Sequence, residues 1–149
     1  MAYLKEPEEI RRFIRHIYEG NPFMNDYFHI EIDEIACGAV TVSLKTDPAK
    51  HANHRGIIHG GVMAALTDSV LGVTGASVGA VVVTVSMTLD YIRNTTPGER
   101  LSVKSRIRHC GRSTMVIDMS LFDEEGTLLV DALATMMIVG HFPEVPFKW

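Results

Sequence analysis

The sequence has few of the features that mark several large classes of protein. Its two cysteines, Cys37 and Cys110, match no metal-binding or redox spacing. The net charge of −4 argues against broad nucleic-acid binding. No apolar run approaches the ~20 residues that would cross a membrane, and the acidic first residues are unlike a secretory signal. We therefore expect a cytoplasmic protein that binds neither nucleic acid nor membrane.

What the sequence does contain is typical of an ordinary globular protein. Of its 149 residues, 46% are hydrophobic and 21% are charged. It has no internal repeats, low-complexity segments or linker. We predict one domain over residues 1–149, with a helix and loop over 1–25 and an irregular tail over 140–149.

Residues 7–19 predict an amphipathic helix. Pro7 and two acids open the segment, and the helix should end at the turn residues 20–22. Apolar residues recur at helical spacing, at Ile10, Phe13, Ile14, Ile17 and Tyr18.

A second helix is predicted with the Gly60-Gly61 pair in its first turn, and it is apolar almost all round. Such a helix is normally enclosed by other structure. It contains one acid, Asp68, and a buried carboxylate is costly unless it has a partner or a function. Asp68 is therefore the first candidate for a functional residue.

The rest of the chain predicts antiparallel strands. Residues 27–45 alternate apolar and polar side chains, with a turn or bend at Cys37-Gly38, and a polar loop covers 46–58. Four more strands are expected over 81–91, 101–108, 115–121 and 128–139, as a meander that follows the helix. The predicted class is α+β, with a curved sheet around the helix and a second copy of the chain covering what remains.

A set of residues spanning this helix resembles a known family. Asn53, His59-Gly60-Gly61, Asp68 and the later VTVSMTLDYIRNTTPGE are similar to the hotdog-fold acyl-CoA thioesterases of the phenylacetate-pathway and thioesterase superfamily member 2 types. The resemblance covers roughly residues 25–139. It implies the hotdog fold with an additional N-terminal helix, hydrolysis of acyl-CoA to acid and coenzyme A without metal or cofactor, and a homodimer assembled into a homotetramer.

The residues also make chemical sense as a site. Backbone N–H groups at a helix start lack intrahelical partners and can stabilise an oxyanion. The resemblance implies the Gly60 amide for this role, with Asn53 orienting the carbonyl or the water. Asp68 lies eight residues further on, about 12 Å along the helix. Two helices must therefore supply the two halves of the site. The resemblance implies that Asp68 of a second subunit acts as nucleophile or general base, at sites in the dimer interface.

Several assignments keep a purely structural alternative. Ser86, eighteen residues after Asp68, matches a family serine that positions the water, with Thr84 as a weaker candidate, but Ser86 can also be an ordinary strand residue. His59 can act in catalysis or can orient its loop. Asn53 can simply form a turn, and hydroxyl groups alone can satisfy Asp68.

Basic residues are the candidates for holding coenzyme A. Arg and Lys suit phosphates, and the predicted residues are Arg93, Arg106, Arg108 and Arg112. Gly61, at the start of the helix, is also predicted to bind the substrate. The alternative is a strand face that is basic for solubility. His51, His54 and His59 share a loop but lack metal-ligand spacing, so we expect no metal site.

Two other functions fit the same fold. The segment starting at His141, with the sequence HFPE, resembles a motif of hotdog dehydratases, although there the motif precedes the central helix. A hotdog hydratase or dehydratase and a non-catalytic acyl-CoA-binding protein are therefore the alternatives.

Overall fold

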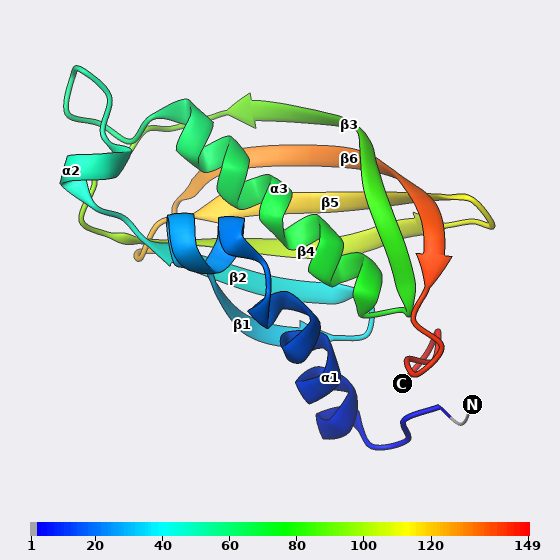
Figure 1. Cartoon of the computed structure of the whole chain (residues 1–149). Helices are drawn as coiled ribbons and strands as arrows, with labels where there is room; N and C mark the ends of the chain where they lie inside the picture. Colours follow the sequence, from blue (N-terminus) through cyan, green and yellow to red (C-terminus); the bar gives the residue numbers. More distant parts are fainter. Residues whose placement is uncertain (1–2) are drawn as a thin grey trace.

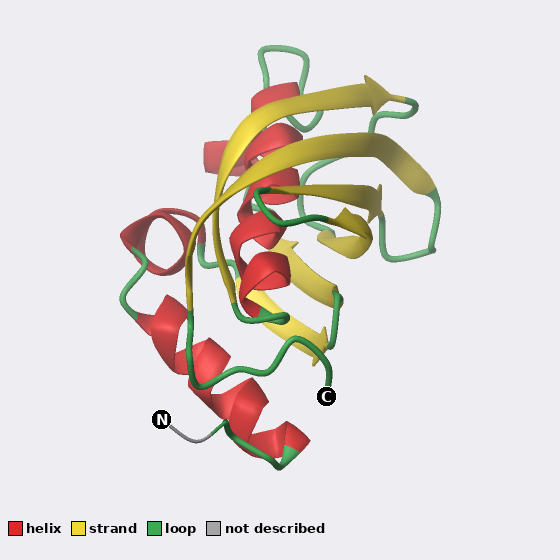
Figure 2. Ribbon diagram, turned by 90° about the vertical axis from the view of Figure 1, so that its right-hand side faces the viewer, coloured by secondary structure: helices red, strands yellow, loops and turns green. Residues whose placement is uncertain are grey.

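The computed structural model describes residues 3–149 and consists of a curved antiparallel sheet around one long helix (Figure 1, Figure 2). The elements are α1 (Pro7–Glu19), π-helical η1 (Phe23–Phe28), β1 (Glu31–Ala36), β2 (Ala39–Lys45), α2 (Pro48–His51), α3 (Gly60–Ala76), β3 (Ala80–Tyr91), β4 (Arg100–Cys110), β5 (Thr114–Phe122) and β6 (Leu128–His141). The strand order is β1-β2-β4-β5-β6-β3. No helix within residues 3–149 is long and apolar enough to cross a membrane.

Both predicted long helices are confirmed. α1 has the expected bounds, and Ile10 and Ile14 on its apolar stripe are completely buried. α3 begins at Gly60, as the Gly-Gly pair predicts. The turn at Cys37-Gly38 is also confirmed, and Gly38 takes a φ of 78° that glycine adopts without strain.

The predicted meander is correct for three strands and wrong for the fourth. β4, β5 and β6 are consecutive neighbours, but β3 pairs with β6 and β4 pairs with β2. The reason is the connection over residues 92–99, which is tied to the loop before α3. The Gly98 N–H donates to Thr46 Oγ1 at 2.8 Å, and the Ile58 N–H donates to the Thr95 carbonyl at 2.9 Å. β3 is therefore an edge strand.

The strand predicted from residue 27 starts too early, because η1 extends to Phe28. Local polar side chains compete for the backbone there. Asn25 Nδ2 donates to the carbonyls of Tyr18 and Glu19 at 2.7 and 2.9 Å, and Asn21 Oδ1 accepts the Met24 N–H. Alternation of apolar residues persists through this segment, but the backbone is helical.

The two edges of the sheet differ. At the β1 edge, Arg11 Nε donates to the Ile35 carbonyl at 2.9 Å, and Arg15 donates to the carbonyls of Ile32 and Asp33. These side chains from α1 occupy acceptors that another strand would otherwise use. Within residues 3–149, no other element bonds along the outer edge of β3. Only the β3 edge is therefore open to pairing.

The single chain does not enclose α3 on all sides. Met63, Leu66, Val70, Leu71 and Val73 are buried against the concave face of the sheet. One strip of α3 remains partly or fully exposed and consists of small or polar residues: Gly61, Ala64, Ala65, Asp68, Ser69 and Gly72. We call it the open strip of α3.

The tail after β6 has no regular structure but closes the far end of α3. Trp149 Nε1 donates to the Ser77 carbonyl at 2.7 Å, at the C-cap of the helix. The Arg11 guanidinium lies 5.5 Å from the Trp149 ring centroid. One side chain thus joins α1, α3 and the C-terminus.

We predict that Trp149→Ala lowers the free energy of unfolding by about 2–3 kcal/mol, because it removes this hydrogen bond and a half-buried ring. Urea denaturation measures the change. Lys148→Ala, at the exposed neighbouring position, is the matched control and should stay within about 0.5 kcal/mol of the parent protein. Equal stability of both variants would show that the tail does not support the fold.

Candidate active site

His59 defines the start of α3 and leaves one backbone amide free. Its backbone is extended, and its Nδ1 accepts a hydrogen bond of 2.9 Å from the Gly61 N–H, so it is an N-cap. Within residues 3–149, no acceptor bonds the Gly60 N–H. This half-buried amide lies at the positive end of the helix dipole. The loop therefore satisfies the Gly61 amide and leaves the Gly60 amide for a ligand.

Tyr91, at the end of β3, fixes Gly60 from the other side. Its hydroxyl donates to the Gly60 carbonyl at 3.0 Å. A Cβ added to Gly60 would lie 3.4 Å from the Tyr91 ring, an ordinary contact. The sequence motif contains Tyr91, but sequence reasoning gave it no role.

Asn53 forms a turn and also keeps a free donor. Its Oδ1 accepts the N–H groups of Arg55 and Ile57 at 2.9 and 3.3 Å. Its Nδ2 has no partner among residues 3–149. The turn-forming interpretation thus describes the oxygen, while the nitrogen can donate to a bound group.

Asp68 lies on the open strip of α3 and is exposed in the single chain rather than buried. Thr84 of β3 donates a hydrogen bond to Asp68 Oδ1 at 3.2 Å. The other carboxylate oxygen has no partner within residues 3–149. A carboxylate held by one oxygen and free at the other can accept a proton or attack a carbon.

Ser86 does not lie on the same face as Asp68, because β3 contains a bulge. Pairing shifts between Thr84 and Ser86, so that Thr84 pairs with Met136 but Ser86 pairs with Thr135. Directly paired residues share a face, and Met136 and Thr135 are consecutive, so they face opposite ways. Thr84 therefore faces α3, and Ser86 faces the convex side. Counting residues along the chain could not reveal this change of face.

The chain thus brings these residues together in two separate groups. Gly60, His59 and Tyr91 meet at the start of α3, with Asn53 in the adjoining loop. Asp68 and Thr84 meet two turns further along, about 12 Å from Gly60. At this separation, the two groups of one chain cannot both contact the carbonyl group of one thioester.

The predicted phosphate-binding arginines are not gathered. Arg93 follows β3 and lies at the Gly60 end of the sheet. Arg106 is on the convex face, and Arg108 makes an ion pair of 2.7 Å with Asp118. Arg112 is in the β4–β5 turn, at the opposite end of β4 from residues 92–99. In the single chain, only Arg93 lies near the start of α3.

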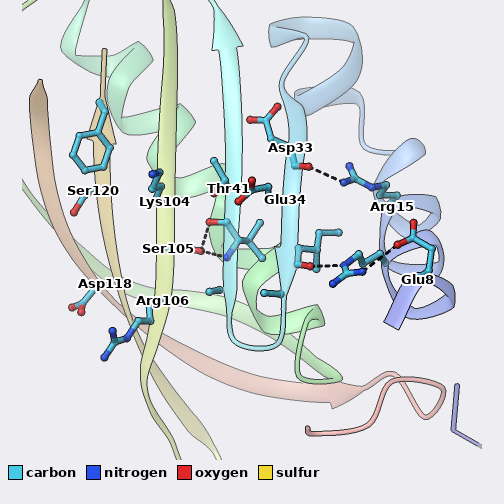
Figure 3. A pocket seen from close by; sticks show the side chains of 16 residues that line it. Glu8, Arg15, Asp33, Glu34, Thr41, Lys104, Ser105, Arg106, Asp118 and Ser120 are labelled. Carbon is cyan, nitrogen blue, oxygen red and sulfur yellow. Dashed lines mark hydrogen bonds and ion pairs between the residues drawn. The ribbon is translucent and has the colours of Figure 1, made fainter. Parts of the chain in front are cut away.

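A cavity of about 740 Å³ lies between α1 and the convex side of the sheet. Figure 3 shows the side chains that line it. Its wall carries both signs of charge, from Glu8, Arg15, Asp33, Lys104, Arg106 and Asp118. Arg106 lines it, whereas Asn53, Gly60 and Asp68 do not. We assign no part of the candidate active site to this cavity.

His141 is also remote from the start of α3. It pairs with Ala80, just beyond the end of α3, about 25 Å from Gly60 along the helix axis. The dehydratase-like sequence around it does not adjoin the candidate site. In the part of the chain that the structure describes, no three His, Cys, Asp or Glu side chains are grouped as metal ligands.

The chain is similar in sequence and in structure to proteins of the thioesterase superfamily. The sequence matches the thioesterase superfamily model over residues 55–130, just over half of the chain. No curated protein matches significantly. A hypothetical thioesterase from Streptococcus pneumoniae, solved with coenzyme A, is 29% identical, with a TM-score of 0.74 over 78% of this chain and 91% of that one. A Streptococcus mutans protein bound to acetyl-CoA is 26% identical, with a TM-score of 0.73 over 77% of this chain and 92% of that one.

The fold extends to a more distant structure as well. The PaaI protein of the Escherichia coli phenylacetic acid degradation operon is 21% identical, with a TM-score of 0.83 over 91% of this chain and 96% of that one. The architecture is therefore the hotdog fold, as the resemblance implies. Two other structures are alanine variants of the pneumococcal protein, one at an aspartate and one at a threonine sixteen residues later, the separation of Asp68 and Thr84. The chain belongs to the thioesterase superfamily.

Proposed function

We propose that this protein is an acyl-CoA thioesterase, which hydrolyses an acyl-CoA to a free acid and coenzyme A. The observation that carries the proposal is the Gly60 amide, which has no acceptor within residues 3–149 at a helix start that is otherwise capped. Membership of the thioesterase superfamily and two similar structures with coenzyme A or acetyl-CoA support this substrate class.

The active unit is a dimer in which two subunits share each site. The β3 edge is open, and Val83 and Val85 on β3 are 49% and 58% exposed. The open strip of α3 lies under the same edge, because Thr84 of β3 bonds Asp68. A two-fold pairing of β3 edges would cover both surfaces. It would also direct Asp68 of each subunit toward the Gly60 of the other.

Hydrolysis then follows from the two groups. The Gly60 N–H of one subunit binds the carbonyl oxygen, and Asn53 Nδ2 orients the carbonyl or the water. Asp68 of the other subunit takes a proton from water, whose oxygen bonds the carbonyl carbon. When the C–S bond breaks, the proton passes from Asp68 to the thiolate. Alternatively, Asp68 attacks the carbon itself and the C–S bond breaks, which gives an anhydride and a thiolate. Water then cleaves the anhydride to the free acid and the Asp68 carboxylate, and the proton released passes to the thiolate.

Thr84, rather than Ser86, positions the carboxylate. Its hydrogen bond occupies Oδ1 and leaves Oδ2 without a partner among residues 3–149. Arg93 is the candidate for the coenzyme A phosphates, because it lies at the Gly60 end. The homotetramer and the cytoplasmic location stay predictions.

We predict that Gly60→Pro abolishes most activity while the protein stays folded. Proline at the first helical position removes only an N–H that the helix does not use. His59 already has the extended φ of −66° and ψ of 132° that a following proline requires. The value of kcat should fall about 10²–10³-fold. Gly60→Ala, which keeps the N–H, is the control, and equal activity of the two variants would remove Gly60 from the mechanism.

A second prediction tests the shared site. Asp68→Asn should lower kcat by about 10²–10⁴-fold. Mixing unfolded Asp68→Asn and Gly60→Pro chains and refolding them should restore about a quarter of the activity, since half of random dimers are mixed and each keeps one intact site of two. Dimers confirmed by sedimentation that recover no activity would contradict the shared site.

A third prediction separates the two hydroxyl groups. Thr84→Val keeps the side-chain shape and should lower kcat about 10–100-fold, the effect of losing a hydrogen bond to a charged group. Ser86→Ala should stay within about twofold, because its side chain faces the convex side. The opposite ranking would restore Ser86 as the positioning residue.

The alternative functions have distinct outcomes. A hydratase would add water to an enoyl-CoA without releasing a thiol, and a thiol assay run beside an absorbance assay for the double bond separates the two reactions. A binding protein would retain an acyl-CoA unchanged through a long incubation. Either result would overturn the thioesterase proposal.

A further inference from the structure

A crevice opens between η1, α2 and the first turn of α3. Two adjoining hollows of about 440 and 250 Å³ share the lining residues Tyr27, Phe28, Lys50 and His51. We call these four residues and the space between them the η1–α2 crevice. The larger hollow also reaches Val62, the third residue of α3. None of the residues assigned to catalysis above lines it.

One wall of the η1–α2 crevice is aromatic. The ring centroids of Tyr27 and Phe28 are 4.9 Å apart, and Phe28 stacks on His51 at 5.7 Å with an interplanar angle of 22°. Tyr27 is 71% exposed. An exposed aromatic ring beside a hollow offers apolar contact area to a ligand.

His51 contributes a hydrogen-bond donor to the crevice. The residue is only 7% exposed, and its Nδ1 accepts the Asp47 N–H at 2.8 Å. Burial lowers the pKa of His51. The Asp47 charge opposes this shift, and the Lys50 charge adds to it. Because Nδ1 accepts a hydrogen bond, it carries no proton, and the proton of the imidazole is on Nε2.

The Nε2–H of His51 has no hydrogen-bond partner within residues 3–149. Every fully buried side-chain nitrogen and oxygen of those residues does have a partner, so Nε2 cannot be fully buried. Because His51 lines both hollows, Nε2 is accessible from the crevice. The lining also carries both signs of charge, from Lys45 and Lys50 and from Asp26, Glu31 and Asp47. A ligand oxygen in the crevice would satisfy the one unpaired donor of a nearly buried ring.

The crevice is connected to the catalytic end of α3. The His51 carbonyl accepts the His59 N–H at 2.9 Å, and His59 caps the helix. Val62 belongs to the first turn of α3, as Gly60 does, so the larger hollow reaches the turn that carries the amide proposed to hold the thioester carbonyl. A ligand would have to span about one helical turn, roughly 5 Å, to join that amide to the crevice.

We infer that the η1–α2 crevice binds the acyl group and that the His51 Nε2–H binds an oxygen at its far end. The ligand class is an acyl group with an apolar body and a distal hydroxyl or oxo oxygen. The apolar body lies against Tyr27 and Phe28. This inference rests on the proposed function, because it concerns the acyl part of the thioester held at Gly60.

The test compares butanoyl-, hexanoyl- and octanoyl-CoA, each with and without a terminal hydroxyl. In at least one pair, kcat/KM should favour the hydroxylated member about 10–100-fold, because the alkyl member leaves the donor unpaired. His51→Asn places an oxygen at the Nδ1 position, keeps the Asp47 bond and removes the distal donor, so the preference should fall to about twofold or less. His51→Gln places an amide nitrogen at the Nε2 position and should keep the preference above about fivefold.

Tyr27→Ala is a second variant with little risk to folding, since Tyr27 is largely exposed. It should raise KM about fivefold for both members of each pair and leave the preference unchanged, because the ring contacts only the apolar body. If His51→Asn does not fold, His51→Gln and Tyr27→Ala decide the matter. A KM unchanged in Tyr27→Ala, or a preference lost in His51→Gln, would then overturn the inference.

Failure of the inference is distinct from failure of the proposed function. If the parent protein hydrolyses these thioesters without preference in any pair, or if folded His51→Asn keeps the full preference, the crevice assignment alone is wrong. If no thioester is hydrolysed, the proposed function is wrong. Calorimetric binding of the same pairs as non-hydrolysable thioethers then tests the crevice, and equal affinities would overturn it.

Discussion

The burial of α3 is the constraint on which the rest of the structure depends. The helix is apolar on nearly every side, and each large side chain removed from water contributes about 1.5–3 kcal/mol. A flat sheet would cover one side of such a helix, so the strands curve to follow it (Figure 2). Six strands still cover only part of the circumference. The part left open is lined by small residues and Asp68.

The edges of the sheet direct any assembly to that open side. Arg11 and Arg15 occupy carbonyls along β1, so this edge offers few acceptors to another strand. β3 keeps its free edge and lies directly over the open strip, as the bond between Thr84 and Asp68 shows. A second subunit that paired with the β3 edge would consequently also cover the open strip of α3. In this arrangement the surface that would join two subunits is also the surface that carries the carboxylate.

Sequence reasoning captured the features that local pattern determines. The bounds of α1, the start of α3 and the β4–β6 hairpins follow from periodicity, proline, glycine and turn residues. The position of β3 beside β6 depends on bonds between residues 92–99 and a distant loop, which no local pattern encodes. The start of β1 was misjudged because side-chain amides hold η1 in a helix.

The same distinction, between local pattern and strand pairing, decided which site residues could be predicted from the sequence. The residue types and order around Gly60 and Asp68 pointed to an oxyanion site and a carboxylate. Thr84 was ranked below Ser86, since strict alternation places both residues on one face. The bulge between them reverses the face, and a bulge is a property of the pairing rather than of the strand's own sequence. His51 was considered only as a metal ligand, because its stacking on Phe28 is visible only in the fold.

The proposed mechanism depends on a loop that bonds to itself before substrate arrives. His59 binds the Gly61 amide, Tyr91 binds the Gly60 carbonyl, and Asn53 Oδ1 closes its own turn. Among residues 3–149, the Gly60 N–H and Asn53 Nδ2 are left without an acceptor by these bonds and are already held in position. Fixed donors stabilise developing charge without the cost of reorganising at the moment of reaction. The carboxylate, by contrast, is solvated in the single chain. In the proposed dimer, a second subunit would both complete the site and exclude water from Asp68, so that dimer formation would be required for the chemistry.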